Sequence, residues 1–268
     1  MSPASLAPTL DIRRPSAHVA EVWLNRPEVR NAFNDGVIAE LTAAFRTLGA
    51  DGDLRAIVLG GHGKAFCAGA DLSWMRAMAD YTWAQNHADA GALAEMLWTV
   101  YSCPVPVVGR IHGDCVAGGV GLAAVCDVLL AADGVHFCLS EARLGLLPAT
   151  IGPYVVRALG EQACRRFFTT AERFSAQRAL ALGFVHEVVL AEALDARVAE
   201  TVAALVANGP AAVRACKQLV KDVAGRPIDA TLRDDTARRI ADIRASAQGR
   251  EGVQAFLDQR DPAWRSPA

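Results

Sequence analysis

Two glycine-punctuated loops constrain the fold of this chain more than any other feature of its sequence. They read Lys64-Ala-Phe-Cys-Ala-Gly-Ala-Asp71 and His112-Gly-Asp-Cys-Val-Ala-Gly-Gly-Val-Gly-Leu122, and each follows a short apolar run and leads into a helical pattern. Two such loops can direct two backbone N–H groups at one point, which stabilises a developing oxyanion or enolate oxygen. Neither loop has the spacing of a P-loop, a dinucleotide fingerprint or a metal cluster. We therefore expect carbonyl polarisation by the backbone, with a side chain elsewhere moving the proton.

The remaining pattern predicts an α/β core followed by helices. Apolar runs predict strands at 19–24, 56–59, 107–111, 128–131, 135–139 and 185–189. Helical spacing predicts helices after Asn34 or Asp35, which can cap the first of them, and at about 73–78, 84–100 and 118–124. From 161 to 257 helical periods dominate. We expect a core over 1–200 and a helical region over 201–268.

Composition excludes several classes of protein. The net charge of −2 argues against a nucleic-acid binder, and the chain has no uncharged stretch long enough to span a bilayer. The seven cysteines show no Cys-x-x-Cys spacing, so we expect no zinc site or disulfide framework and a reducing cytoplasm. Met1–Ile12 lacks the pattern of a secretory signal.

Five motifs together resemble the crotonase family, the enoyl-CoA hydratase/isomerase superfamily. They are Leu24-Asn-Arg-Pro27 with Asn31-Ala32, Ala65-Phe-Cys-Ala-Gly-Ala-Asp71, Ile111-His-Gly113 through Gly118-Gly119, Ser140-Glu-Ala-Arg-Leu-Gly-Leu146-Leu-Pro148, and Glu251-Gly252 with Ala255-Phe256. The resemblance implies a spiral of ββα units, a C-terminal helical trimerisation region, an acyl-CoA substrate, and a homotrimer or homohexamer. It implies no metal and no cofactor beyond the coenzyme A of the substrate.

The resemblance also assigns roles to residues. Ala68 and Gly118 would donate the two N–H groups to the thioester oxygen, and Glu141 would be the acid/base at the α-carbon. The helix expected after Gly118 supports the assignment of Gly118 as an N–H donor, because the first N–H groups of a helix are unpaired and lie at the positive end of the helix dipole. The residues that would line the acyl-CoA site are Arg26, Lys64, Ala65, Ala68, Gly69, Ala70, Asp71, Leu72, Gly118 and Arg143.

One position departs from the family pattern. The best-known hydratases have a second glutamate three residues after the glycine that matches Gly118, and this chain has Gly121 there. Hydration of an enoyl-CoA by Glu141 is our main interpretation, and a Δ3,Δ2-enoyl-CoA isomerase, which needs one carboxylate, is the first alternative. A non-catalytic acyl-CoA or RNA binding protein of the same fold is the second. The segments 119–122 and 141–149 look most like hydratases of branched glutaconyl-CoA substrates such as 3-methylglutaconyl-CoA or isohexenylglutaconyl-CoA, which act in leucine and acyclic-terpene degradation.

Several polar residues near these motifs have simpler interpretations. Arg143 can pair with a substrate carboxylate, although a structural role is the stronger interpretation. Asp71 is better placed to cap a helix than to transfer protons, and Asp114 is typical of an ordinary turn. Cys67 and Cys115 have no histidine in a partner motif, so we expect buried small side chains rather than nucleophiles.

Overall fold

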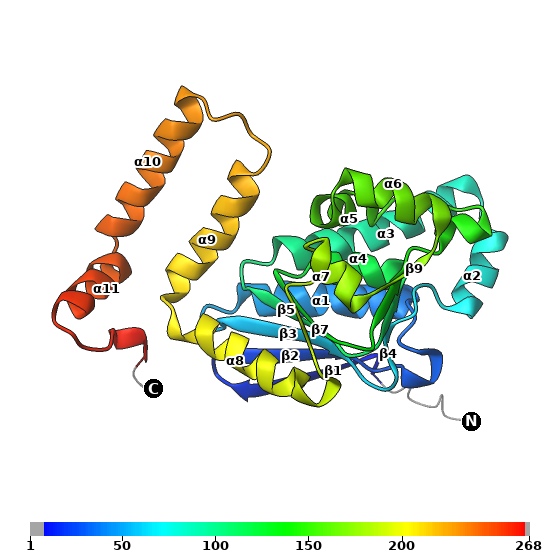
Figure 1. Cartoon of the computed structure of the whole chain (residues 1–268), viewed down its shortest axis with the longest axis horizontal. Helices are drawn as coiled ribbons and strands as arrows, with labels where there is room; N and C mark the ends of the chain where they lie inside the picture. Colours follow the sequence, from blue (N-terminus) through cyan, green and yellow to red (C-terminus); the bar gives the residue numbers. More distant parts are fainter. Residues whose placement is uncertain (1–7, 266–268) are drawn as a thin grey trace.

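The computed structural model describes residues 8–265, and it is built on two sheets (Figure 1). The larger sheet has the order β1-β2-β3-β5-β7-β10. Its strands are β1 (Leu10–Ser16), β2 (Val19–Leu24), β3 (Ala56–Gly61), β5 (Val107–Ile111), β7 (Val128–Ala132) and β10 (Glu187–Val189). Strand β1 runs antiparallel to β2, and the other neighbouring strands are parallel. The expectation that Met1–Ile12 is not a secretory signal falls partly outside the described residues, which begin at residue 8.

The smaller sheet has the order β4-β6-β8-β9. Its strands are β4 (Ala65–Cys67), β6 (Asp114–Val116), β8 (His136–Cys138) and β9 (Arg173–Ser175). The chain passes from β3 to β4, from β5 to β6 and from β7 to β8, so it visits the large sheet and then the small one in each repeat. This alternation confirms the α/β class and the spiral of strand–strand–helix units.

Helices follow these strand pairs. They are α1 (Asp35–Ala50), α2 (Leu72–Ala79), α3 (Trp83–Ser102), α4 (Gly118–Ala124), the 3-10 helix η2 (Glu141–Leu144), α5 (Gly152–Leu159), α6 (Glu161–Thr170), α7 (Ala176–Ala181) and α8 (Leu194–Ala207). Asn34 caps α1 by accepting the N–H of Val37, as its position in the sequence predicts. The apolar residues Val37, Ile38, Leu41, Phe45 and Leu48 of that helix are buried. Helix α1 packs against α3, and α8 packs against β3, β5 and β7.

Beyond α8 the chain forms what we call the C-terminal arm, which contains α9 (Pro210–Val223), α10 (Ala230–Ala245) and α11 (Ala247–Leu257). Figure 1 shows α10 and α11 standing away from the sheets. Polar contacts from α9 join the arm to the core. Arg214 donates to the carbonyls of Asp51 and Leu54, and Lys217 forms an ion pair with Asp127 at 2.6 Å. No helix among residues 8–265 is long and apolar enough to cross a membrane.

Candidate active site

The two glycine loops touch each other backbone to backbone. Gly69 has a φ of +89°, and a Cβ there would lie 3.0 Å from the Cβ of Ala117. A Cβ on Gly119 would lie 2.5 Å from the carbonyl oxygen of Cys67. Only glycine permits this conformation and this approach. The convergence of the loops, inferred from their sequence, is therefore present in the fold.

Each loop has an N–H group without an acceptor in the described part of the chain. Gly118 is the first residue of α4, and the first bonds of that helix run from Val120 and Gly121 to the carbonyl of Ala117. In the first loop the N–H of Ala68 donates to the carbonyl of Arg30 at 3.0 Å, whereas that of Ala70 has no acceptor. The assignment of Ala68 as a donor to substrate is therefore wrong, because its N–H is already bonded. The geometry favours Ala70 as the partner of Gly118.

The segment 30–33 fixes both loops, a role that the sequence alone does not reveal. Asn31 is 1% exposed, and its side chain donates to the carbonyls of His62 and Ala65, at 2.8 and 2.9 Å. Phe33 forms a parallel bridge with Ala70, and its ring lies 3.1 Å from where a Cβ of Gly118 would be. The Asn-Ala pair in the first motif was the available signal, but its partners are distant in sequence.

Glu141 lies close to these loops in the topology. It begins η2, three residues after β8, and β8 is paired with β6, the strand that leads to Gly118. Its Oε2 is buried and has no hydrogen-bond partner, a condition that it shares only with Nδ1 of His112 among residues 8–265. Burial raises the pKa of Glu141 above its usual value of 4.5. An unpaired, partly desolvated carboxyl is suited to accept and return a proton.

Two other predicted site residues bind each other. Arg26 donates to one carboxylate oxygen of Asp71 at 2.8 Å, and the other oxygen accepts from the N–H and hydroxyl of Ser73. These bonds lower the pKa of Asp71 to about 2, first of all through the bond from the Ser73 hydroxyl. Asp71 is the N-cap of α2, as expected, so its side chain and that of Arg26 hold the end of the first loop. Lys64 and Leu72 are exposed, and Ala65 is buried in β4.

The side chains of the remaining candidate residues form hydrogen bonds within the protein or are buried. Arg143 donates to the carbonyl of Ala171 at 2.5 Å, and Asp114 accepts from Arg173. The Cys67 and Cys115 side chains are fully buried, and burial raises the pKa of Cys67 to about 12. Both cysteines therefore have the buried character that the sequence predicts.

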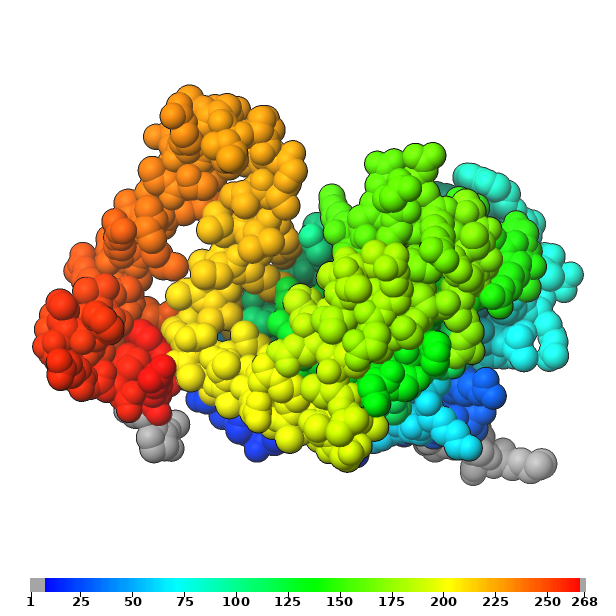
Figure 2. All heavy atoms as spheres, in the orientation of Figure 1, coloured from blue at the N-terminus to red at the C-terminus, as the bar shows by residue number. Residues whose placement is uncertain are grey.

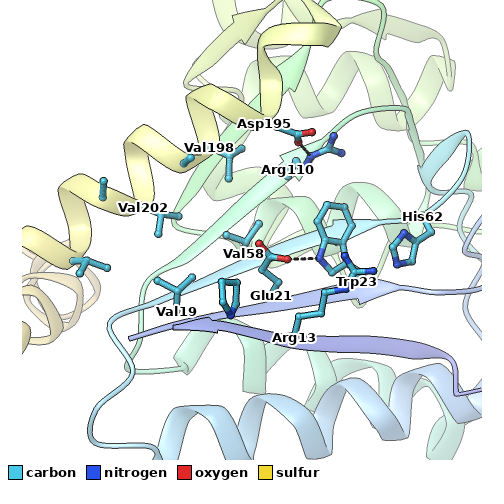
Figure 3. A pocket seen from close by; sticks show the side chains of 14 residues that line it. Arg13, Val19, Glu21, Trp23, Val58, His62, Arg110, Asp195, Val198 and Val202 are labelled. Carbon is cyan, nitrogen blue, oxygen red and sulfur yellow. Dashed lines mark hydrogen bonds and ion pairs between the residues drawn. The ribbon is translucent and has the colours of Figure 1, made fainter. Parts of the chain in front are cut away.

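A separate groove of about 710 Å³ lies between α8 and the large sheet (Figure 3). Valines form much of its wall, and Trp23 lies among charged residues at one end. The arginines there are already paired, because Arg110 binds Asp195 and Arg13 binds Asp11, and Glu21 accepts the indole N–H of Trp23. The groove therefore lacks the unpaired polar groups found at the loops. In the described residues no group of three or more His, Cys, Asp or Glu side chains could hold a metal ion.

Comparison with known proteins finds relatives that match almost the whole chain. The sequence profile described as Enoyl-CoA hydratase/isomerase matches residues 14–267. The enoyl-CoA hydratase ACTT6 of Alternaria alternata is 33% identical over 256 residues, which cover 92% of this chain and 82% of that protein. The crystal structure of an enoyl-CoA hydratase from Shewanella pealeana has a TM-score of 0.92 at 38% identity and covers 96% of both chains. Pseudomonas aeruginosa AtuE has a TM-score of 0.92 at 36% identity, covering 96% of this chain and 100% of that one.

Proposed function

Since the chain belongs to the enoyl-CoA hydratase/isomerase family, also called the crotonase family, we propose that it adds water across the α,β double bond of an enoyl-CoA. The observation that carries this proposal is the buried carboxylate oxygen of Glu141, without a partner in residues 8–265. Glu141 follows β8, which is paired with β6, the strand that leads to Gly118. A base and a pair of N–H donors are the groups that hydration of a conjugated thioester requires.

The proposed reaction balances with one carboxyl group. Glu141 takes a proton from water as the water oxygen bonds to the β-carbon, and the π electrons move to the thioester oxygen. The N–H groups of Ala70 and Gly118 donate to that oxygen in the enolate. The Glu141 carboxyl then returns a proton to the α-carbon as the carbonyl forms again. No electron donor or acceptor takes part in this reaction. The proposed mechanism therefore uses no cofactor other than the coenzyme A that is part of the substrate.

For the acyl group we infer a branched glutaconyl thioester, such as 3-methylglutaconyl-CoA. Such a substrate carries a second carboxylate, which suits a guanidinium. Arg143 follows Glu141 by two residues, and only one of its nitrogens donates to an acceptor in the described part of the chain. Three exposed leucines, Leu144, Leu146 and Leu147, follow and offer apolar surface to a branched chain.

One observation favours isomerisation as a second candidate. Position 121 holds no carboxylate, and Gly121 lies directly against Ile151. A 1,3 proton shift between Δ3 and Δ2 enoyl-CoA requires a single base, which removes a proton from one carbon and returns it to another. Glu141 alone could perform it.

Absorbance of the conjugated thioester distinguishes these activities. With crotonyl-CoA or 3-methylglutaconyl-CoA, hydration lowers the absorbance, whereas isomerisation of a 3-enoyl-CoA raises it. Unchanged absorbance with all three, together with heat of binding for an acyl-CoA analogue, would leave a binding protein as the explanation.

The role of Glu141 has its own test. In Glu141→Gln the hydration kcat should fall by about 10²–10⁴-fold, the usual worth of general acid–base catalysis, with little change in acyl-CoA affinity. The control is Glu192→Gln, an exposed residue of the 3-10 helix 191–193, which should keep wild-type activity. Because the base must be ionised, kcat/KM should fall as the pH drops through the raised pKa of Glu141. Wild-type activity in Glu141→Gln would refute the assignment.

We also propose that the chain forms a homotrimer or a dimer of trimers. A groove of about 540 Å³ separates α9 from α10, and Figure 2 shows an opening between these helices. The large apolar side chains of Ile228 and Phe256 on this arm are 84% and 80% exposed. Contact with other copies would cover them. Light scattering should give at least three times the monomer mass of 28.4 kDa, and a monomer at micromolar concentration would contradict this.

A further inference from the structure

Gly121 has no space for a side chain. It is buried in the first turn of α4, where a Cβ would overlap Cγ2 of Ile151 and lie 2.6 Å from its Cβ. Positions three apart share a helix face, so position 121 is on the same face as Gly118. The N–H group assigned to the thioester oxygen lies one turn before it, at the N-terminus of α4.

Ile151 is held firmly in this place. Its side chain is 2% exposed and belongs to the hydrophobic core. Its carbonyl accepts the N–H groups of Tyr154 and Val155 at the start of α5, which fixes the backbone. The segment that runs from Glu141 through η2 ends at Ile151, so the chain that supplies the carboxylate also fills the space beside Gly121.

The charges near Glu141 do not replace a second carboxylate. Burial, and no charged side chain, raises the pKa of Glu141. Arg143 on the same 3-10 helix donates to the carbonyl of Ala171, and Arg173 on β9 is paired with Asp114 on β6. Among residues 8–265, no second carboxylate contributes to the pKa shift of Glu141.

We propose that Ile151 is a positioning residue that closes position 121 and leaves Glu141 to carry both proton transfers of the reaction. This inference rests on the proposed hydration. Its physical consequence is that activity depends on the ionisation of one carboxyl group. A second carboxylate at position 121 becomes possible only after the Ile151 side chain, including its Cβ, is removed.

Stability measurements test the packing part without any substrate. Gly121→Glu alone should unfold at a lower denaturant concentration than wild type, and adding Ile151→Gly should recover part of that loss. Ile151→Ala is the matched control, because its Cβ would still lie 2.6 Å from the new one and should restore less. Equal rescue by glycine and alanine, or a Gly121→Glu variant as stable as wild type, would overturn the proposal.

The pH dependence of kcat/KM tests the catalytic part. Wild type should show one ionisation on its acidic limb, with a tenfold fall in rate per pH unit below it. The double variant Gly121→Glu, Ile151→Gly should gain a second ionisation, since a like charge raises the pKa of one carboxyl. The variant Gly121→Gln, Ile151→Gly should not.

Two ionisations in wild type, or identical profiles for the Glu and Gln double variants, would overturn the single-carboxyl assignment. If wild type hydrates no enoyl-CoA, the proposed function fails, and the denaturation series still decides whether Ile151 closes position 121.

Discussion

Replacing Asn31 by alanine should destabilise the protein by about 3–5 kcal/mol. The side chain is buried and makes three hydrogen bonds, accepting from the N–H of Arg26 and donating to the carbonyls of His62 and Ala65. Each bond contributes about 0.5–1.5 kcal/mol, and partners left buried without a bond add to the loss. Asn31 also has a φ of 57°, and the left-handed region costs an alanine about 1–2 kcal/mol.

Urea unfolding followed by circular dichroism measures this loss. With an m-value near 3 kcal/mol/M, the midpoint should fall by about 1–2 M. Asn31→Gly removes the same three bonds but tolerates the positive φ, so it should lose about 1 kcal/mol less than alanine. Asn208→Ala is the control, because Asn208 is exposed and its side chain has no hydrogen bond in the described part of the chain.

The expected change is large against the total stability of a domain, which is about 5–15 kcal/mol. Activity should fall as well, since the bonds to His62 and Ala65 hold the strand that precedes the Ala70 N–H. An Asn31→Ala variant within 1 kcal/mol of wild type, or a glycine variant less stable than the alanine one, would refute this reasoning.

Three further predictions follow from the same geometry. Gly69→Ala should lower kcat at least tenfold and destabilise the loop, because of its φ of +89° and the contact with Ala117, whereas Gly52→Ala, with open space around it, should be neutral; equal activity would contradict this. The pKa of Asp71 falls from 3.8 to about 2 on folding, so its bonds stabilise the protein above pH 3.8 and are lost as the pH drops towards 2. In Asp71→Asn the free energy of unfolding should therefore depend less on pH between about 3.8 and 2 than in wild type. The same pH dependence in both proteins would exclude this contribution of Asp71 to stability. A disulfide reagent should reach the buried Cys67, whose pKa is about 12, only on unfolding, and a fast reaction of Cys67 in the folded protein would count against this.

The elements with strong periodicity could be predicted from the sequence. Strand β5 and helix α4 have the predicted bounds, and Asn34 caps α1. The strands β4 and β6 inside the glycine loops were missed, because three residues show no periodicity. Their pairing forms a second sheet, and it depends on neighbours about 50 residues away.

The errors in the candidate site have the same origin. Ala68 and Ala70 are equivalent on spacing alone, and the bond from Ala68 to the carbonyl of Arg30 separates them. The contact between Gly121 and Ile151 could not be predicted from the sequence either. Ile151 is thirty positions further along the chain, and its sequence context is typical of an ordinary core residue. Glu141 was selected by its place after an apolar strand and by the resemblance of residues 140–148 to a family motif, and its catalytic role stays a prediction.

Backbone strain gathers where the N–H donors must be held. The described residues include five non-glycine positions with positive φ. Three of them are at the loops, with Ala117 inside the second loop and Arg30 and Asn31 bonded to the first. Such conformations persist only when surrounding bonds hold them. Here the Asn31 side chain bonds, the bond from Ala68 to Arg30 and the bond from Ala117 to the carbonyl of Cys138 do so. The loops are therefore fixed before substrate arrives, and fixed donors stabilise an oxyanion without reorganisation during the reaction. A substitution that relaxes this strain without removing any of these bonds should make the protein more stable and less active.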